Sequence, residues 1–335
     1  MDSYGKRIIY IHRGRNKKAV RVGKLFTSQD YNFDFRGKNR VLLLLKAWIT
    51  AREIPQADIY FVEGGLCFWP AWFLKKRFPT SKIILRAMDP LFYLDPRKKT
   101  IATFFYKWRM KQMKACLDGM IAVSEMIKND ALKWISCPIK VVPNFIIDIE
   151  RFKPSHSDSQ NTLVFVCERP LETGYVKGLD RVIDIFQQVK KKVPDTELIL
   201  VGSGTENLNY NIEGIEYLGY QEIEKVYQRA SITILPARYD AFPLVVGETI
   251  LSGVIPIVSD HVGSQALLTQ HKDKLVVNGD DSLEPFVSAV CHIMSLSTEQ
   301  RKNILNDLTP SAADLSEDHI LGRIKDAWDT LLKEI

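Results

Sequence analysis

The stretch from Ser231 to Gly263 constrains the fold of this chain more than any other part of it. Its pattern predicts three successive elements: an apolar strand at 232–235, a helix opened by Phe242-Pro243 that ends near Gly253, and a second apolar strand at 255–258. Proline in a first helical turn loses no needed hydrogen bond, and the free N–H groups of residues 244–246 lie at the positive end of the helix dipole. We therefore expect this turn, at the carboxyl end of a strand, to bind a phosphate.

Two acidic residues, Asp240 and Glu248, frame this turn. Because an ionised carboxylate only accepts hydrogen bonds, it is suited to hold the vicinal hydroxyls of a sugar or a ribose on either side of a diphosphate. The same spacing is also common for an exposed loop acid followed by an ordinary surface acid of a helix. The spacing alone leaves both interpretations open.

The composition is that of a globular protein. The chain has 335 residues, 46% hydrophobic and 26% charged, which is enough for two hydrophobic cores. It contains no run of eighteen apolar residues, and its N-terminal apolar segment is too short for a signal peptide. Its five cysteines lack metal-ligand spacing, which indicates reduced thiols. We expect the protein in the cytoplasm, either free or peripheral on the cytoplasmic face of a membrane.

Charge is distributed unequally along the chain. Residues 1–150 hold 28 Lys and Arg against 13 Asp and Glu, whereas the remaining residues hold 18 against 27. An excess of this kind indicates an anionic partner for the first half, such as a phospholipid surface, a phosphate-bearing acceptor or nucleic acid. We disfavour nucleic acid because the sequence contains no recognisable nucleic-acid-binding module.

Residues 98–117 have the apolar spacing of an amphipathic helix. One face carries Ile101, Phe104, Phe105 and Trp108, and a neighbouring face carries three lysines. An aromatic face beside a basic face is typical of a helix in an anionic membrane interface, but also of a core helix with a solvated flank. Amphipathicity does not choose between the two.

The segment around Asp240 resembles the donor-site segment of family 4 retaining glycosyltransferases. The resemblance rests on Tyr239, an acid, Phe242-Pro243 and, five residues after Pro243, Glu248, followed by Ser252–Val258 and Gly263. Asp240 stands where that family usually has Glu. This family has the GT-B fold, and the resemblance extends in order over most of residues 58–335.

The resemblance implies an α/β chain with two Rossmann-like, doubly wound domains that face a central cleft. The alternation of strands and helices in two halves predicts the same architecture independently. We expect an acceptor-side domain at 1–150, a nucleotide-sugar-binding domain at 151–316, and a C-terminal helix at 317–335 that returns towards the first domain.

On the donor side, the resemblance implies a diphosphate clamp of Arg169, after the strand at 163–166, and Lys177, at the opening of the next helix. Asp240 then holds the transferred sugar and Glu248 the ribose, and Asp240, Lys177 and Arg169 are the catalytic candidates. The remaining donor-binding candidates lie in the turns near the nucleotide and the base: Phe242, Leu244, Val245, Gly202, Gly204, Tyr217 and Leu218.

On the acceptor side, the resemblance points to two strand ends. The first is the turn Gly64-Gly65 after the strand at 58–63, and the second holds Arg86 and Asp89. Met88 occupies the place where the family frequently has His. The glycine pair that the family carries after its first strand is absent, because Gly14 and Gly23 stand apart.

The implied reaction is metal-independent transfer of a hexose-type sugar, with retention of configuration, from a UDP- or GDP-sugar to a glycan or lipid-linked acceptor, as in cell-surface polysaccharide or glycolipid assembly. No cofactor beyond the nucleotide sugar is implied. Two alternatives stay open: a non-catalytic protein that binds sugar nucleotides or glycans, and an enzyme that isomerises nucleotide sugars.

Overall fold

The computed structural model describes residues 5–14, 17–35, 37, 39–97, 100–154, 161–279 and 282–335. Its contacts divide the chain into two compact units. Unit 1 comprises Met1–Asn144 and Asp318–Ile335, and unit 2 comprises Phe145–Glu317. The first division thus falls a few residues before position 150, and almost all of the C-terminal helix is counted with unit 1.

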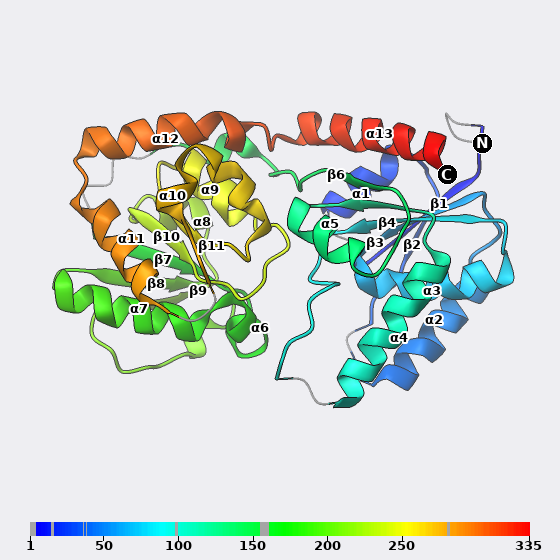
Figure 1. The fold of residues 1–335 in the computed structure, drawn as a ribbon, viewed down its shortest axis with the longest axis horizontal. Helices are drawn as coiled ribbons and strands as arrows, with labels where there is room; N and C mark the ends of the chain where they lie inside the picture. Colours follow the sequence, from blue (N-terminus) through cyan, green and yellow to red (C-terminus); the bar gives the residue numbers. More distant parts are fainter. Residues whose placement is uncertain are drawn as a thin grey trace. The chain divides into compact units, whose positions relative to one another are not determined.

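Unit 1 is built on a six-stranded sheet of order β2-β1-β3-β4-β5-β6, in which all neighbouring strands are parallel (Figure 1). The strands are β1 (Ile8–His12), β2 (Asp30–Asn32), β3 (Ile59–Glu63), β4 (Lys82–Ala87), β5 (Gly119–Ala122) and β6 (Ile139–Val141). The helices are α1 (Lys17–Lys24), α2 (Arg40–Glu53), α3 (Gly64–Arg77), α4 (Thr100–Cys116), α5 (Glu125–Leu132) and α13 (Glu317–Glu334).

The central strands of unit 1 are apolar because helices cover both of their faces. Every residue of β1 and β3 is buried, as expected for a parallel sheet between two helical layers. The C-terminal helix α13 packs on this core through Trp328, whose ring lies 4.4 Å from that of Phe26 and 5.0 Å from that of Phe61. Helix α13 is therefore part of the core of unit 1, although it is the last element of the chain.

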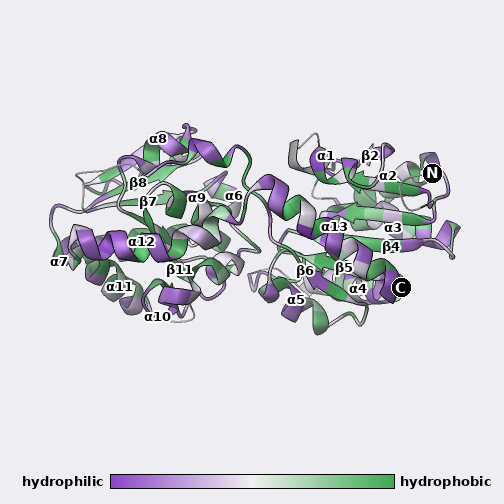
Figure 2. Cartoon of the chain, turned by 90° about the horizontal axis from the view of Figure 1, so that it is seen from above, coloured by the Kyte–Doolittle hydropathy of each residue, from purple (hydrophilic) through white to green (hydrophobic). Residues whose placement is uncertain are grey.

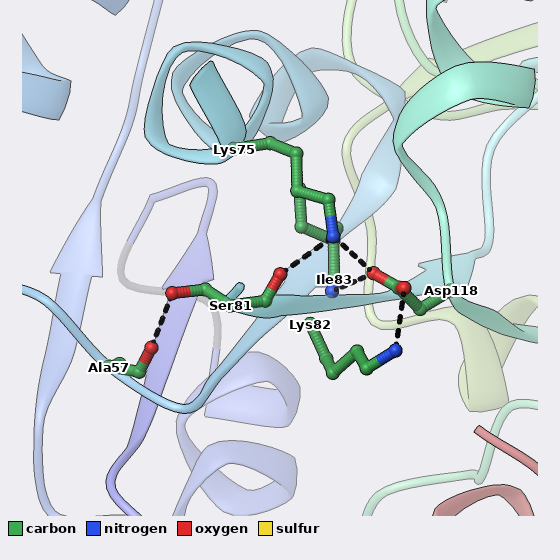
Figure 3. Close-up of polar contacts among 6 residues, drawn as sticks. All are labelled: Ala57, Lys75, Ser81, Lys82, Ile83 and Asp118. Carbon is green, nitrogen blue, oxygen red and sulfur yellow. Dashed lines mark hydrogen bonds and ion pairs between the residues drawn. The ribbon is translucent and has the colours of Figure 1, made fainter. Parts of the chain in front are cut away.

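Asp118 fastens three elements of unit 1 together at the amino ends of β4 and β5 (Figure 3). Its Oδ2 accepts hydrogen bonds from Lys75 Nζ at 3.0 Å and from the backbone N of Ile83 at 2.9 Å. Its Oδ1 accepts one from Lys82 Nζ at 3.3 Å, and Lys75 Nζ also donates to the carbonyl of Ser81. This carboxylate therefore holds the end of α3 against the start of β4.

Unit 2 is built on a second parallel sheet, of order β12-β11-β10-β7-β8-β9. The strands are β7 (Thr162–Val166), β8 (Glu197–Val201), β9 (Ile215–Gly219), β10 (Ile232–Leu235), β11 (Ile255–Ser259) and β12 (Val276–Val277). The α-helices are α6 (Pro170–Lys177), α7 (Leu179–Lys192), α8 (Ile223–Tyr227), α9 (Val245–Leu251), α10 (Lys272–Leu275), α11 (Glu284–Ser295) and α12 (Thr298–Ala313). Short 3₁₀ helices lie at η1 (Ile149–Arg151), η2 (Thr205–Asn207) and η3 (Gly263–His271). Figure 2 shows hydrophobic residues gathered on the strands and hydrophilic residues along α12.

The structure confirms the two predicted strands of the Ser231 segment, as β10 and β11. The helix between them, α9, is shorter than predicted and begins at Val245. The predicted turn at Gly64-Gly65 is wrong, because α3 begins at Gly64, directly after β3.

The helix predicted to begin at Lys177 is α7, and it begins two residues later, at Leu179. Lys177 itself is the last residue of α6, a helix that was not predicted. Pro170 occupies the first turn of α6, where a missing N–H costs nothing. Gly178 ends the helix in the left-handed conformation, with φ 83°, and its N–H donates to the carbonyl of Tyr175. Both residues are helix-boundary signals, so α6 was detectable in the sequence.

Candidate functional site

The order in which the chain adds strands to the sheet of unit 2 reverses between β7 and β10. From β7 the chain builds β8 and β9 on one side, and β10, β11 and β12 follow on the other side. Ligands of open α/β sheets bind at the carboxyl ends of the two strands that flank such a point. The loop after β7 leads to Arg169, and the loop after β10 leads to Asp240. The topology thus brings residues far apart in sequence to one edge of the sheet.

Lys177 and Asp240 form an ion pair at this edge, between Nζ and Oδ2. The backbone of Asp240 is fixed from both sides, because its N–H donates to the carbonyl of His261 and its carbonyl accepts from the N–H of Gly263. The Asp240 side chain is 12% exposed and that of Lys177 is 36% exposed. The pair therefore presents its cation, more than its anion, to solvent.

Arg238 positions this pair, a role that sequence reasoning missed. Its guanidinium makes two hydrogen bonds to Asp180, at 2.7 and 2.6 Å, and a third to the carbonyl of Tyr175 at 2.6 Å. Its Cζ also lies 3.8 Å from the centre of the Tyr175 ring. Burial by itself would raise the pKa of Asp180, but the hydrogen bonds and charge of Arg238 outweigh it and lower that pKa. Arg238 thereby joins the loop that carries Asp240 to both α6 and α7.

Arg169 lies at the same edge but points elsewhere. Its backbone is left-handed, with φ 51°, and its N–H donates to the carbonyl of Ser203 at 2.8 Å. Its guanidinium pairs with Glu172 at 3.1 Å, and both side chains are about two-thirds exposed. The guanidinium of Arg169 thus contacts Glu172, whereas Lys177 contacts Asp240.

A cavity of about 260 Å³ opens beside this edge, entirely within unit 2. Its lining comes from the ends of β7, β8 and β9 and from η1, α8 and α9: Arg151, Val166, Glu168, Val201, Gly202, Tyr220, Gln221, Ile223 and Glu248. It contains two of the predicted donor-binding residues, Gly202 and Glu248. Five residues of the lining, Arg151, Glu168, Tyr220, Gln221 and Glu248, carry polar groups suited to hydrogen bonding.

Glu248 of α9 lies between a buried tyrosine and a cation. Burial, and then the charge of Glu248, raise the pKa of Tyr227 well above its usual value, so this phenol stays protonated. Arg151 is paired with Glu224 at 2.5 Å, and Glu248 also favours its charged form. The surroundings therefore include a neutral phenol and a cation beside the carboxylate, which suits a carboxylate that accepts hydroxyl hydrogen bonds.

Gly202 is required by the backbone at the end of β8. Its φ is 127°, and a Cβ would lie 2.5 Å from the carbonyl oxygen of Cys167. Gly204 is also left-handed, with φ 96°, and its N–H donates to Glu206 at 2.8 Å. At the Gly-x-Gly turn the end of β8 therefore approaches the end of β7 so closely that position 202 requires glycine.

We expect Gly202→Ala to lower the free energy of unfolding by about 2–3 kcal/mol, because it adds steric overlap to a strained backbone angle. Gly322→Ala in α13 is the matched control, because a Cβ there meets no atom within 4 Å. Urea unfolding followed by circular dichroism measures both. Equal stability of the two variants would contradict the interpretation of the turn.

The other predicted donor residues divide between β9 and the entry to α9. Leu218 occupies a register irregularity of β9, where Leu200 pairs with Tyr217 but Val201 pairs with Gly219. The hydroxyl of Tyr217 accepts a hydrogen bond from the N–H of Tyr210 at 3.0 Å. At the entry to α9, Phe242 is buried, whereas Leu244 and Val245 are half-buried.

The predicted acceptor-side residues all lie in unit 1, at the carboxyl ends of β3 and β4. The N–H of Gly65 donates to Asp89 Oδ2 at 2.9 Å, and Gly64 is left-handed with φ 77°. Burial raises the pKa of Asp89, and the Gly65 hydrogen bond and Arg109 oppose that shift. Gly64, Gly65 and Asp89 therefore form one local cluster.

Arg86 belongs to a different contact, with a residue of the neighbouring strand. It is 1% exposed, its Nη1 lies 3.7 Å from Glu63 Oε1, and its Nη2 donates to Asn144 Oδ1 at 2.8 Å. Burial raises the pKa of Glu63, and the charge of Arg86 opposes that shift. Arg86 is thus held by buried partners within unit 1.

Among the residues that the structure describes, no group of three or more His, Cys, Asp or Glu is arranged to hold a metal ion. No helix among them is long and apolar enough to cross a membrane.

Comparison with known proteins finds similarity to glycosyltransferases, chiefly over unit 2. Residues 160–295 match the model of the glycosyl transferases group 1. An exopolysaccharide phosphotransferase of Streptomyces coelicolor is 29% identical over 192 residues, covering 53% of this chain and 20% of the relative. A UDP-Gal:α-D-GlcNAc-diphosphoundecaprenol α-1,3-galactosyltransferase of Escherichia coli is 21% identical over 232 residues, covering 60% of this chain and 58% of the relative. The match thus spans less than two thirds of the length of these relatives.

Solved structures share the fold over nearly the whole chain. A trehalose-6-phosphate synthase of Burkholderia multivorans has a TM-score of 0.73 at 11% identity, covering 98% of this chain and 99% of that one. A sucrose-phosphate synthase of Thermosynechococcus elongatus has a TM-score of 0.72 at 14% identity, covering 97% and 99%. At these identities the likeness establishes the fold alone, which is the expected two-domain α/β fold of GT-B type.

Proposed function

Since residues 160–295 form a glycosyl transferases group 1 domain on a GT-B fold, we propose that this chain is a retaining, metal-independent glycosyltransferase. In this proposal it moves a hexose-type sugar from a nucleotide diphosphate sugar to a glycan or lipid-linked acceptor. The observation that carries the proposal is the Lys177–Asp240 pair at the carboxyl ends of β7 and β10, beside the cavity that contains Glu248.

The proposed roles follow from charge and position. Lys177 neutralises the leaving diphosphate, together with Arg169 if its guanidinium turns away from Glu172. Asp240 accepts hydrogen bonds from the sugar hydroxyls, and Glu248 accepts them from the ribose. The bond between the anomeric carbon and the phosphate oxygen breaks as the acceptor oxygen attacks from the same face. The departing phosphate takes the acceptor's proton, so the reaction needs no side-chain nucleophile.

The names of the relatives support the substrate class. The Escherichia coli relative is named for UDP-Gal and for an acceptor on diphosphoundecaprenol, and the Streptomyces coelicolor relative is named for exopolysaccharide. A UDP-sugar donor is therefore our first choice, with a GDP-sugar second. A lipid-linked acceptor in cell-surface polysaccharide or glycolipid assembly fits the basic character of residues 1–150.

We also propose that the protein works in the cytoplasm, at the cytoplasmic face of a membrane. All five cysteines are free, and burial raises the pKa of each thiol, that of Cys137 to about 11. Protonated, partly or wholly buried thiols fit a reducing compartment.

A thermal-shift panel of UDP-, GDP-, ADP- and CMP-sugars tests the donor assignment. One donor is expected to stabilise the native chain and to leave an Asp240→Ala/Glu248→Ala variant unshifted, because binding to the folded state alone raises its stability. If no donor shifts either protein, the donor-site assignment fails.

Glu248→Gln is expected to weaken binding of that donor about 10- to 100-fold, since it removes charge-assisted hydrogen bonds to the ribose. Glu197→Gln is the matched control, because Glu197 is exposed at the opposite, amino end of β8. Isothermal titration calorimetry measures both affinities. Equal affinity in the two variants would remove Glu248 from the proposed site.

A second function, non-catalytic binding of a sugar nucleotide, is favoured by Met88. Its Sδ lies 3.8 Å from Arg86 Nη1, at the position where the family frequently has His. A binding protein would bind the donor without releasing a nucleoside diphosphate. Release of the diphosphate, with or without acceptor, selects the transferase.

A further inference from the structure

Helix α2 carries an apolar face that is open to solvent. Val41 is 74% exposed, and Leu42, Leu45, Trp48 and Ile49 are each more than two-fifths exposed. Their spacing places them on one side of the helix. A surface helix of a globular protein normally shows polar residues on its solvent-facing side. An exposed apolar face of this kind therefore indicates an interaction site.

The opposite side of α2 already makes the contacts that hold it in unit 1. Leu43, Ala47 and Ala51 are buried on that side. The exposed side carries the larger apolar residues, and the buried side carries two alanines. Packing within unit 1 therefore does not explain why the exposed side is apolar.

Helix α4 extends the apolar face. Arg40, at the start of α2, donates from Nη1 to the carbonyl of Ile101 at 2.8 Å and lies 4.7 Å from the centre of the Phe105 ring. The two helices therefore begin side by side, as Figure 1 shows for the helices below the sheet of unit 1. The exposed side chains of both helices make up what we call the α2–α4 face: Val41, Leu42, Leu45, Trp48, Ile49, Ile101 and Phe104.

The residues of the aromatic face predicted for 98–117 lie in two different environments. Phe105 and Trp108 lie against Trp69 of α3, with ring centres 5.2 and 5.1 Å away. Ile101 and Phe104 instead point outward, 77% and 74% exposed. One part of α4 is thus packed on α3, as in a core helix, and another part is exposed to solvent.

The helices that form or adjoin the α2–α4 face are strongly basic. Helices α2, α3 and α4 together carry ten Lys and Arg but a single acidic residue, Glu53. Three exposed lysines, Lys107, Lys111 and Lys114, follow one another along α4. Arg52 lies over the ring of Trp48, 4.9 Å from its centre. Apolar and aromatic side chains beside cations are the combination that binds an anionic lipid interface.

We propose that the α2–α4 face docks unit 1 onto an anionic phospholipid surface. The apolar side chains enter the boundary between headgroups and acyl chains, and the lysines of α4 lie among the lipid phosphates. This deepens the membrane part of the proposed function by naming the surface. Its test needs no sugar transfer, so its failure is separate from failure of the donor site.

Vesicle flotation with the full chain tests this docking. We expect binding to vesicles with about 30 mol% phosphatidylglycerol in phosphatidylcholine to be at least about tenfold stronger than to phosphatidylcholine alone. Leu45→Gln/Trp48→Gln is expected to weaken it at least about tenfold. The control, Leu132→Gln/Leu171→Gln, changes two other exposed apolar residues and should bind as the wild type does.

A second pair of variants tests the charge. Replacing Lys107, Lys111 and Lys114 by Gln should weaken binding at low salt and reduce its salt dependence, because attraction between exposed charges is screened. The same change at Lys191, Lys302 and Lys325, which are exposed on other helices, should have little effect. Circular dichroism and the donor thermal shift verify that each variant is folded.

Three results would overturn the proposal. The first is absence of binding to anionic vesicles at low salt, and the second is equal binding by the Leu45→Gln/Trp48→Gln variant and its control. The third is a dimer, detected by light scattering, that the Leu45→Gln/Trp48→Gln variant dissociates, since the face would then join two copies of the chain.

Discussion

Lys177→Ala is expected to lower the rate of donor cleavage about 100- to 1,000-fold, the loss typical of one preorganised charge at a developing anion. Lys177 is the cation of the pair at the switch point of unit 2, and its side chain is the more exposed of the two. Its loss also leaves Asp240 as an unpaired carboxylate beside the incoming diphosphate, which adds repulsion. Release of the nucleoside diphosphate from the donor selected by the thermal-shift panel measures the effect.

Two binding measurements separate a phosphate contact from a structural role. Lys177→Ala should weaken binding of the nucleoside diphosphate but leave binding of the unphosphorylated nucleoside unchanged. Lys192→Ala is the control, because Lys192 is an exposed lysine of unit 2 that pairs with Glu284 and contacts neither member of the Lys177–Asp240 pair. If Lys177 only positions Asp240, the affinity for the nucleoside diphosphate stays as in the wild type, and the clamp assignment is wrong.

A double-mutant cycle measures how the two members of the pair depend on each other. The Lys177→Ala/Asp240→Ala variant is expected to lose less activity than the sum of the two single variants, in free-energy terms, because each single change also destroys the pair. Additive losses would instead assign the two side chains to independent contacts.

The alternation of strands and helices could be predicted from the sequence because strands that are buried on both faces are largely apolar runs. Ile232 to Leu235 and Ile255 to Val258 are runs of this kind, and both are strands. The boundaries of helices were harder to predict. The segment from Pro170 to Lys177 contains Gly174 and reads as a loop, although its proline and the following Gly178 are a helix start and a helix end.

Site residues can be predicted from the sequence where the signal is a local motif. Contacts between residues far apart in the sequence cannot be predicted in this way. The sequence predicts both Asp240 and Lys177 as site residues, but their contact joins residues far apart in sequence, and Arg238 holds the two loops together. The burial of Glu63 likewise follows from the parallel register that sets it opposite Arg86. Neither contact has a periodic signal in the sequence.

The second large effect is expected in unit 1, where Arg86→Met should lower the free energy of unfolding by about 3–5 kcal/mol, because it leaves a buried carboxylate without its partner. Arg86 and Glu63 are 1% and 5% exposed, so water cannot replace the lost contact. Lys133→Met is the matched control. Lys133 is 69% exposed in its pair with Asp130, and its loss should cost less than about 1 kcal/mol.

The cost of Arg86→Met should also depend on pH in a defined direction. Burial already raises the pKa of Glu63, and removal of Arg86 removes the one charge that opposes that shift. In the variant the folded state therefore holds its proton more tightly than the unfolded state. Its stability is then greatest below the ordinary pKa of a glutamic acid and is lost as the pH rises through the raised value.

Urea unfolding of Arg86→Met and wild type at several pH values measures this dependence. The stability difference should be larger at pH 8 than at pH 5, and Glu63→Gln/Arg86→Met should remove most of that difference in pH dependence, because it has no carboxyl group to titrate. A stability loss that is the same at both pH values would place the cost in packing around Arg86, including its hydrogen bond to Asn144, and not in the charge of Glu63.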